Sequence, residues 1–280
     1  MPSQPDAGST TGRPYDNNRA VNALCFSRPS APRIDNYLLT GKAIYELDQE
    51  AGDALIAAVP GVRDMVRARR AFVKRTVRRL AENGIDQFVD FGCGMPSSEN
   101  VHQVAHAVNS NSRVIYIDHD PIVLQHAWAY LSYPGTEVVT ADVRDMRLVL
   151  AALHEHGLLD LCRPAGVLLT GVLDFVADTH LSAIFTGLRK SLAPRSHVAL
   201  THICTDKLLS AEIETITSIH TRTQTPIYLR DHNAIGSLLQ GFDLDEPGLV
   251  ELYPWGPEEG VWPVKNSFLL GATGTLTHVI

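Results

Sequence analysis

Three aspartates stand where apolar, strand-like runs of the chain end, and carboxylates at such positions are typical ligand-binding groups. Asp90 follows "QFV", Asp118 follows "VIYI" and Asp142 follows "VVTA". The carboxyl ends of neighbouring parallel strands meet at one edge of a sheet, where open α/β folds bind their ligands. We therefore expect the three carboxylates to line one site.

The loop after the first of these acids has two glycines but lacks the third that a dinucleotide site requires. In "DFGCGMPSS", Gly92 and Gly94 fit a G-x-G-x-x-G motif, but Ser97 stands at the third position. The carboxylate of Asp90 beside the loop disfavours a pyrophosphate and favours an ammonium group or another positive centre. S-adenosylmethionine carries an α-ammonium and a sulfonium, so the pattern predicts this cofactor in preference to NAD.

The other two acids suit the nucleoside part of such a cofactor. Asp118 can accept hydrogen bonds from both ribose hydroxyls. Asp142 can accept one from the exocyclic amine of adenine, while the backbone of Val143 pairs with the ring edge.

Alternating segment types predict the sheet that positions these residues. β-branched runs at 87–92, 113–118, 137–142, 165–173 and 197–204 are separated by helical stretches. Such alternation is typical of a doubly wound, mostly parallel α/β sheet covered on both faces. The runs "GLVELYPW" and "NSFLLGATG" predict a final antiparallel pair, to which Trp255 and Trp262 belong as candidate pocket or packing residues.

The segment before the sheet has a different character. Residues 1–20 are rich in Pro, Gly, Ser, Asp and Asn and predict a disordered tail. Residues 21–84 are mainly helical in pattern, and Asn83-Gly84 is a helix-ending signal. We expect a helical cap at 21–84 that can act as a lid over a cofactor domain at 85–280.

Composition limits the kinds of partner. The net charge of −7 over 280 residues argues against a nucleic-acid-binding surface. The basic stretch 67–80 is interpreted as the solvated face of an amphipathic helix. The N-terminus lacks the apolar core of a signal peptide, and no run approaches a membrane span. We expect a cytoplasmic protein with a small-molecule substrate and neither a nucleic acid nor a membrane as partner, and a homodimer stays open.

Cysteines and histidines give no metal signal. The four cysteines form no CxxC pair, which favours a reducing compartment. His102/His106 and His197/His202 have suggestive spacings but no third ligand in a recognised pattern, so we predict no metal. Cys93 is expected to be a small buried thiol inside the glycine loop.

Longer motifs are more informative than the glycine pair. They include "DFGCGMPSSENVHQVAH" (90–106), "VIYIDHDPIVLQHA" (114–127) and "LLTGVLDFVAD" (168–178). With "YLLTGK" (37–42) and "VRARRAF" (66–72), they resemble the actinobacterial S-adenosyl methyltransferase family of the DUF574 type, a branch of the class I methyltransferases. The resemblance runs from about Pro32 to Thr273. It implies a seven-stranded class I methyltransferase sheet with an antiparallel C-terminal hairpin and an N-terminal helical cap.

The resemblance also implies site residues. It assigns S-adenosylmethionine to Asp90, Gly92, Gly94, Asp118, Asp142 and Val143. Cys93 in the loop, His119 beside Asp118, and Thr170 with Gly171 after the fourth strand are predicted to border the cofactor as well. The cap helices are implied to close over it, with Tyr37, Lys42 and Arg67 as candidate residues of the substrate pocket.

Departures from the family pattern fall near the expected chemistry. This chain has "TGKAI" where relatives have "GGKDN", and "RARR" for "RANR", which puts Arg69 in the place of an amide. It has "LDFVAD" for "LHFVPD", so Asp174 replaces an imidazole and can be a general base, an amine-binding group or a helix cap. The catalytic candidates are Asp174, Tyr37 and His202.

Three functions follow from this. The first is an S-adenosylmethionine-dependent methyltransferase of secondary metabolism that acts on a small-molecule or peptide-derived metabolite. The second uses S-adenosylmethionine itself as substrate, closing its aminobutyrate chain into a cyclic amino acid with release of methylthioadenosine. The third is a non-catalytic protein that binds S-adenosylmethionine.

Overall fold

The computed structural model describes residues 27–43, 45–252 and 267–276, and an eight-stranded sheet forms its centre. The strands are β1 (Gln87–Phe91), β2 (Arg113–Asp118), β3 (Thr136–Thr140), β4 (Gly166–Thr170), β5 (His197–Ile203), β6 (Asp243–Leu244), β7 (Val250–Glu251) and β8 (Leu269–Thr275). Their order is β3-β2-β1-β4-β5-β8-β6, and β7 also pairs with β8. Strands β1 to β5 pair in parallel, and β8 runs antiparallel to β5.

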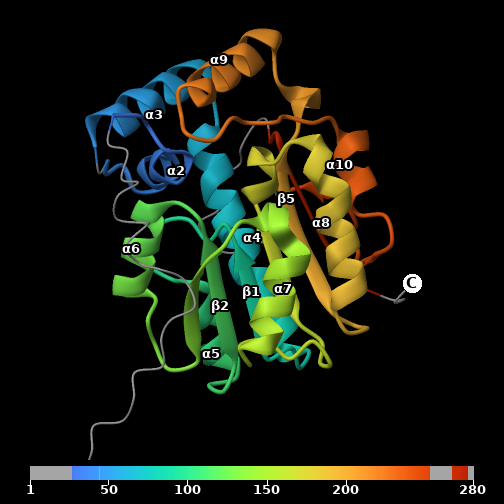
Figure 1. Ribbon diagram of the computed structural model, residues 1–280. Coiled ribbons are helices and arrows are strands. Elements are labelled where there is room, and N and C mark those ends of the chain that lie inside the picture. Colours follow the sequence, from blue (N-terminus) through green and yellow to red (C-terminus); the bar gives the residue numbers. More distant parts are fainter. Residues whose placement is uncertain (1–26, 44, 253–266, 277–280) are drawn as a thin grey trace, which may run out of the picture.

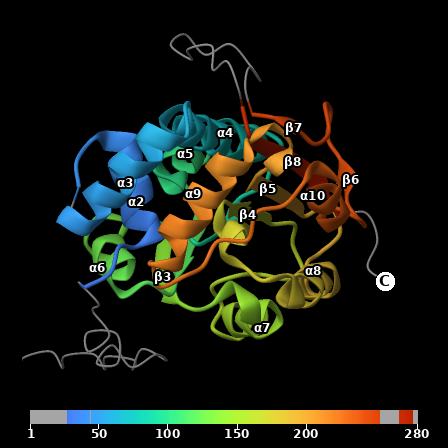
Figure 2. The ribbon, with the colours of Figure 1, turned by 90° about the horizontal axis from the view of Figure 1, so that it is seen from above.

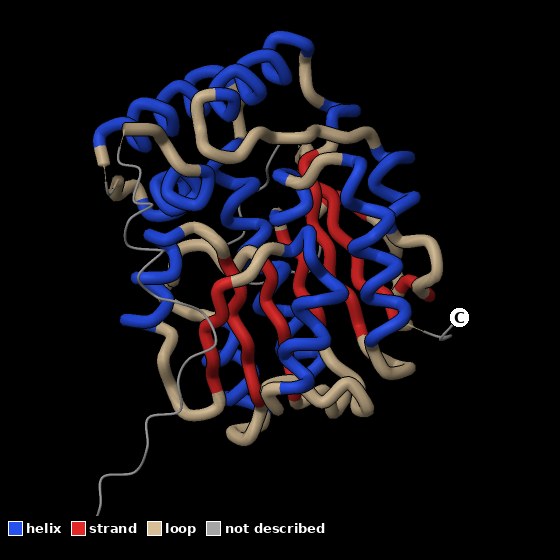
Figure 3. Tube along the Cα trace, viewed as in Figure 1, coloured by secondary structure: helices blue, strands red, loops and turns tan. Residues whose placement is uncertain are grey.

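Helices cover both faces of the sheet, so the strands are enclosed between two helical layers (Figures 1 and 3). They are α2 (Ala31–Thr40), α3 (Glu46–Ala58), α4 (Val62–Glu82), α5 (Val101–Val108), α6 (Pro121–Tyr130), α7 (Met146–Glu155), α8 (Asp178–Ser191), α9 (Ser210–Thr221) and α10 (His232–Leu238). Seen from above, α4 and α5 lie on one side of the sheet and α7 and α8 on the other (Figure 2). Within the described residues, no helix is both long enough and apolar enough to cross a membrane.

The predicted fold class is confirmed. The sheet is mostly parallel, its C-terminal strands are antiparallel, and helices precede it. The eighth strand arises because the two-residue β6 also pairs with β8, beside the predicted pair of β7 and β8. The predicted tail at 1–20, as well as Trp255 and Trp262, lie outside the described residues.

Local sequence signals begin the helices that follow the first two strands. Asp120 caps α6 by accepting hydrogen bonds from the N–H groups of Ile122 and Val123, and Pro121 occupies the first helical turn. A reciprocal capping box between Asn100 and Gln103 begins α5. The side chain of Asp120 therefore caps α6, while the carboxylate of Asp118 stands at the end of β2 and is not used to cap this helix.

The cap is built from two segments that lie far apart in the sequence. Helices α2 and α3 lie beside α9 above the carboxyl edge of the sheet, although α9 comes more than a hundred residues later (Figures 1 and 2). One apolar cluster includes Leu38 of the cap, Phe72 and Leu80 of α4, and Leu168 of the sheet. The division at residue 84 stays a prediction, and the core itself is continuous across it.

Candidate functional site

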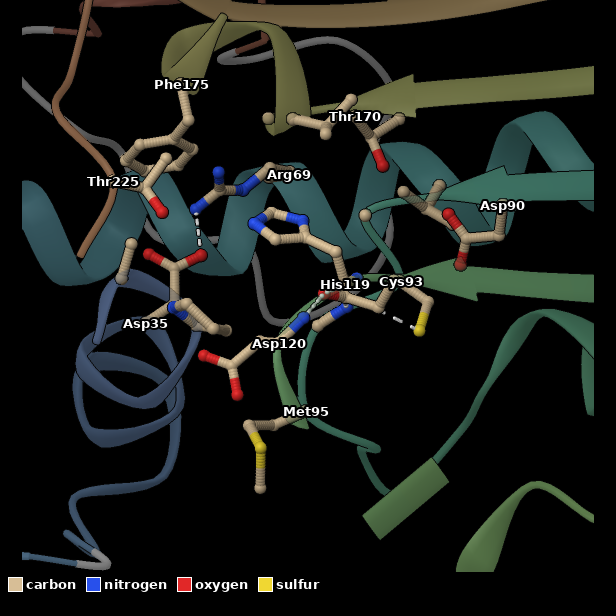
Figure 4. Close-up of a pocket in the computed structure, with 18 of the residues that line it drawn as sticks. Asp35, Arg69, Asp90, Cys93, Met95, His119, Asp120, Thr170, Phe175 and Thr225 are labelled. Atoms are coloured by element: carbon tan, nitrogen blue, oxygen red, sulfur yellow. Dashed lines mark hydrogen bonds and ion pairs between the residues drawn. The ribbon is translucent and has the colours of Figure 1, made fainter. Parts of the chain in front are cut away.

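A cavity opens at the carboxyl ends of β1, β2 and β4, beside the point where the strand order reverses (Figure 4). It comprises about 1040 Å³ of empty space, including the part open to solvent. Helices α2 and α4 cover it with Asp35, Arg69, Arg70 and other residues. The lining residues predicted from the sequence are Asp90, Gly92, Cys93, Gly94, Asp118, His119, Thr170 and Gly171.

The glycine loop brings its backbone to the cavity wall. The N–H groups of Gly92 and Cys93 donate to the carbonyl of Ile117 at 2.8 and 3.1 Å, which ties the loop to β2. A Cβ on Gly92 would lie 2.6 Å from Cγ2 of Val172, so only glycine fits there. A Cβ on Gly94 would meet nothing closer than a nitrogen of Arg70 at 3.9 Å. This open space allows a ligand to approach the backbone at Gly94.

The carboxylate of Asp90 is buried, with 6% of the residue exposed, and it borders the cavity. Burial raises its pKa to about 7, Asp118 adds to the increase, and the positive charge of Arg70 opposes it. No described residue donates a hydrogen bond to Asp90. A buried carboxylate without donors favours a cationic donor from a ligand. The α-ammonium of S-adenosylmethionine is such a donor, so the residues fit this cofactor.

Asp118 organises the loop and still faces the cavity. One carboxylate oxygen accepts hydrogen bonds from the N–H groups of His119 and Asp120 at 2.8 and 2.9 Å. The other accepts the N–H of Gly94 at 3.1 Å. Burial raises the pKa of this carboxyl, and the N–H groups of Asp120 and Gly94 oppose the shift. A carboxylate has about four acceptor positions and three are used here, so one remains for a ribose hydroxyl.

Asp142 and Val143 line a smaller cavity next to the first. The two cavities share Gly92, Asp118, His119, Val172, Phe175 and Thr225. Asp142 accepts a hydrogen bond from the N–H of Arg144 at 2.9 Å and forms an ion pair with its guanidinium. Burial acts to raise the pKa of Asp142, but the hydrogen bonds from Arg144 outweigh it and lower the pKa. The carboxylate is therefore ionised at neutral pH. Arg144 donates to both of its oxygens, so a ligand amine would take the place of part of the guanidinium contact.

Cys93 is a buried thiol, as expected for its position in the loop. Its Sγ lies 4.0 Å from Oδ2 of Asp118. Burial and the nearby carboxylates raise the thiol pKa well above its ordinary value. The group therefore stays protonated at neutral pH and is a poor nucleophile.

Three predicted pocket residues, Tyr37, Lys42 and Arg67, are absent from the described lining of this cavity. Tyr37 is buried between α2 and α3, where its hydroxyl donates to Asp53 at 2.5 Å and its ring covers Gly52. Lys42 is exposed after α2. Arg67 is exposed on α4 and pairs with Asp64 at 2.9 Å. Helices α2 and α4 do contribute to the cavity, but through other faces.

Asp174 and His202 are brought together, but inside the protein and not on the described cavity lining. Nδ1 of His202 lies 2.9 Å from Oδ1 of Asp174, and both residues are at most 1% exposed. Burial acts to raise the pKa of Asp174, but His202, Arg69 and the N–H of Ile203 lower it overall. Arg230 donates to Nε2 of His202 at 2.6 Å, which leaves the proton of a neutral ring on Nδ1. A general base must reach the substrate, and neither residue is among those that line this cavity.

The residues that sequence reasoning missed lie on the cap side of the cavity. Arg69 and Asp35 form an ion pair at 2.5 Å, and Phe175 and Thr225 border the same space (Figure 4). Arg69 was noted only as a departure, and the basic stretch around it was interpreted as solvated, whereas Arg69 is 8% exposed. Thr225 follows α9, and no local signal connects that loop to the site.

The histidine pairs have structural partners. Nδ1 of His102 lies 2.8 Å from the hydroxyl of Tyr116, and Nε2 of His106 lies 2.8 Å from the carbonyl oxygen of Ser112. His197 is joined to Thr275 at 3.0 Å. Among the described residues, no group of three or more His, Cys, Asp or Glu side chains is arranged to hold a metal ion.

Comparison with solved structures gives two similar proteins over nearly the whole chain. A candidate methyltransferase of Thermobifida fusca YX is 33% identical, with a TM-score of 0.82 and coverage of 90% of this chain and 97% of that one. A DUF574 family protein of Streptomyces avermitilis MA-4680 is 31% identical, with a TM-score of 0.81 and coverage of 89% and 97%.

A more distant structure shares the fold alone. Human N-acetylserotonin methyltransferase in complex with SAM is 12% identical, with a TM-score of 0.50 and coverage of 94% of this chain and 66% of that one. A comparison with the curated proteins gave no match.

A family model described as S-adenosyl methyltransferase matches residues 17–276. The cofactor of this family is S-adenosylmethionine, and the fit of Asp90 and the open approach at Gly94 agree with it. The chain belongs to the S-adenosyl methyltransferase family, of the DUF574 type.

Proposed function

We propose that this chain transfers a methyl group from S-adenosylmethionine to a small-molecule or peptide-derived metabolite, in secondary metabolism. The observation that carries the proposal is the cavity itself. It joins a buried, donor-free carboxylate, an open glycine backbone and a second carboxylate beneath the helical cap. A capped site of this kind suits a small acceptor, and the net charge of −7 disfavours nucleic acid.

Each part of the cofactor has a group of this chain assigned to it. Asp90 receives the α-ammonium, and Arg70, which donates to the carbonyl of Met95 at 3.0 Å beside the loop, receives the carboxylate. Asp118 accepts from a ribose hydroxyl. Asp142 and Val143 bind the adenine in the adjoining cavity. When bound, S-adenosylmethionine supplies an electrophilic methyl group on a positive sulfur.

The chain's own contribution to the reaction is alignment and exclusion of water. Helices α2 and α4 cover the cavity, and Phe175 with Thr225 forms the wall beyond Thr170 and Gly171 (Figure 4). An acceptor held against this wall lies opposite the glycine loop. Its nucleophilic atom can then be aligned with the bond between the sulfur and the methyl group. Asp35 and His119 are the cavity groups that can take a proton from it.

Ring closure of S-adenosylmethionine stays the alternative reaction, and binding without turnover the third. No specific contact favours either. The base invoked for ring closure, Asp174, is buried against His202 and Ile203.

Calorimetry on S-adenosylmethionine binding tests the cofactor assignments. We expect Asp118→Asn and Asp142→Asn each to weaken binding by at least about tenfold, because hydrogen bonds to a charged acceptor are lost. Asp64→Asn is the matched control, since this acid pairs with Arg67 on an exposed helix face. Circular dichroism establishes that each variant is folded. Unchanged affinity in both site variants contradicts the proposal.

The released nucleoside distinguishes the three functions. The protein is incubated with S-adenosylmethionine alone and then with added cell extract, and a protein-free sample controls for spontaneous breakdown. Methyl transfer predicts S-adenosylhomocysteine that depends on the extract. Methylthioadenosine formed without extract indicates ring closure. Binding without either product indicates the non-catalytic function.

A further inference from the structure

An ion pair spans the part of the cavity that the cofactor assignments leave free. Nη2 of Arg69 on α4 lies 2.5 Å from Oδ2 of Asp35 on α2. Both line this cavity and not the adjoining one assigned to the adenine, whereas Phe175 and Thr225 border both cavities. Figure 4 shows this group on one side of the cavity, and Asp90 with Cys93 on the other.

The Arg69 guanidinium is held in place and is still largely available for binding. Its side chain is 9% exposed, and it rests directly on Gly171, where a Cβ would lie 2.2 Å from Nη1. A guanidinium has five N–H donors. The bond to Asp35 is the one hydrogen bond that Arg69 makes within the described part of the chain.

Asp35 is also only partly engaged. Its side chain is 39% exposed, and its one hydrogen bond from a described residue is the one that Arg69 donates to Oδ2. The second carboxylate oxygen is therefore free to accept from a ligand. The pair thus offers donors and an acceptor side by side on the cavity wall.

The ion pair of Arg69 with Asp35 is expected to add little to the free energy of unfolding. Bringing an arginine into a cavity wall costs desolvation that its Coulombic attraction to a half-exposed acid repays only in part. The two side chains that face the cavity carry opposite charges, so an acceptor with a single net charge would be complementary to only one of them. A molecule with adjacent carboxylate and ammonium groups compensates both.

We propose that Asp35 and Arg69 determine acceptor specificity and select a zwitterionic, amino-acid-like acceptor, whose carboxylate binds Arg69 and whose ammonium binds Asp35. The apolar body of the acceptor then lies against Phe175. This inference rests on the proposed methyltransferase function and names the substrate class of the same site.

Four phenylalanine derivatives test the charge preference. L-phenylalanine is zwitterionic, N-acetyl-L-phenylalanine is anionic, L-phenylalanine amide is cationic, and N-acetyl-L-phenylalanine amide is neutral. Binding is measured by ligand-observed NMR at about pH 6.5, below the α-amino pKa. Saturating S-adenosylhomocysteine fills the cofactor half, so the probes cannot bind there. We expect the zwitterion to bind at least about tenfold more tightly than the neutral probe.

Variants then separate the two contacts. Arg69→Gln should abolish the advantage of the probes that carry a carboxylate, and Asp35→Asn the advantage of those that carry an ammonium. Arg69→Lys should keep part of the advantage, because it retains the charge without the planar array of donors. Arg67→Gln, two residues away on the exposed face of α4, should leave the ranking unchanged.

The outcomes are distinguishable. If the wild-type protein binds the four probes equally, or if Arg69→Gln and Asp35→Asn lower the melting temperature without changing the ranking, the pair is only a latch between α2 and α4. If Arg69→Gln abolishes S-adenosylmethionine binding, Arg69 belongs to the cofactor half and the inference fails. Absence of cofactor binding in the wild-type protein refutes the proposed function instead.

Discussion

At the scale of single residues, Asp90 connects burial to ligand binding. Its pKa of about 7 means that the carboxyl is largely neutral at pH 6 and becomes a carboxylate as the pH rises. If the ligand ammonium requires the carboxylate, affinity for S-adenosylmethionine should rise about fivefold from pH 6 to pH 7. Calorimetry at several pH values measures this. Asp90→Asn should bind more weakly, and its affinity should not vary over this range.

The same carboxyl affects stability with the opposite sign. Its pKa is raised in the folded protein from 3.8 to about 7, so the folded state binds the proton more tightly than the unfolded state does. The protonated carboxyl therefore contributes up to about 4 kcal/mol to the free energy of unfolding. This contribution is complete below pH 4 and is lost as the pH rises through 7. The free energy of unfolding of Asp90→Asn, measured in urea, should therefore increase relative to wild type between pH 4 and pH 7. A constant difference would show that Asp90 does not titrate in this range.

A comparison of Gly171 with Gly84 distinguishes the cost of backbone strain from the cost of a steric clash. It has a φ of 87° and lies under Arg69, while Gly84 has the same φ and no atom within 4 Å of a Cβ. Gly84→Ala should cost about 1–2 kcal/mol for the left-handed backbone alone. Gly171→Ala should cost more, because its Cβ would lie 2.2 Å from Nη1 of Arg69. Urea unfolding compares the two, and equal losses would mean that Arg69 moves aside freely.

At the scale of elements, Arg230 joins two loops that border the cavity. It donates to the carbonyls of Leu173 and Val176 at 3.0 and 2.6 Å and pairs with Asp178. These contacts hold the turn carrying Phe175 against the segment that follows Thr225, and the N–H of Tyr228 adds a bond to the carbonyl of Asp174 at 2.7 Å. The buried network of Asp174 and His202 therefore positions the turn of Phe175 at the cavity border.

Arg230→Met should release both loops while the sheet stays folded. It leaves buried carbonyls and His202 without a donor, at a cost of about 3 kcal/mol or more. Hydrogen exchange should accelerate at 171–178 and 223–230 before it changes in β1 or β2. Arg163→Met is the control, because that arginine forms an exposed pair with Asp86. Uniform acceleration throughout the chain would mean that Arg230 supports the whole fold and not these loops.

Helix register explains which site residues could be predicted from the sequence. The acids Asp90, Asp118 and Asp142 were predictable because the apolar pattern of a strand shows where it ends, and parallel strands end at the same edge of the sheet. On α4 the inward stripe is Met65, Val66, Arg69, Phe72, Val73, Thr76, Val77 and Leu80. Arg69 is in register with this stripe and Arg67 is not. The helical period therefore indicates that Arg69, and not Arg67, faces inward. The resemblance pointed to the helix but not to its face.

Non-local contacts could not be predicted in this way. The helix at α9 was predictable from its own sequence, but its place beside α3, which brings Thr225 to the cavity, depends on packing between distant segments. The pairing of Asp174 with His202 is similar, because Asp174 lies in the turn after β4 and His202 near the end of β5, and only the pairing of these two strands brings them together. Their burial depends on the segments that pack over this edge of the sheet, among them the one that carries Arg230.

At the scale of the whole molecule, the cap and the sheet share one core, and a buried ion pair joins the cap helices α2 and α3. Asp48 on α3 accepts from Nε of Arg33 at 2.7 Å and from the N–H of Ser30 at 3.0 Å, and both side chains of the ion pair are at most 1% exposed. The hydroxyl of Ser30 donates to Asp120 at 2.8 Å. The cap is therefore connected to the strand-end loop that also carries Asp118.

Asp48→Ala should weaken both stability and cofactor binding. Removing one partner of a buried pair costs about 3–5 kcal/mol, because Arg33 keeps an uncompensated buried charge. The loss should shift α2, which contributes Ala31, Pro32 and Asp35 to the cavity. Thermal unfolding and calorimetry with S-adenosylmethionine measure the two effects, with Asp64→Ala as the exposed-pair control. A lower melting temperature with unchanged affinity would mean that the cofactor binds without the cap, and that the lid acts only on the acceptor.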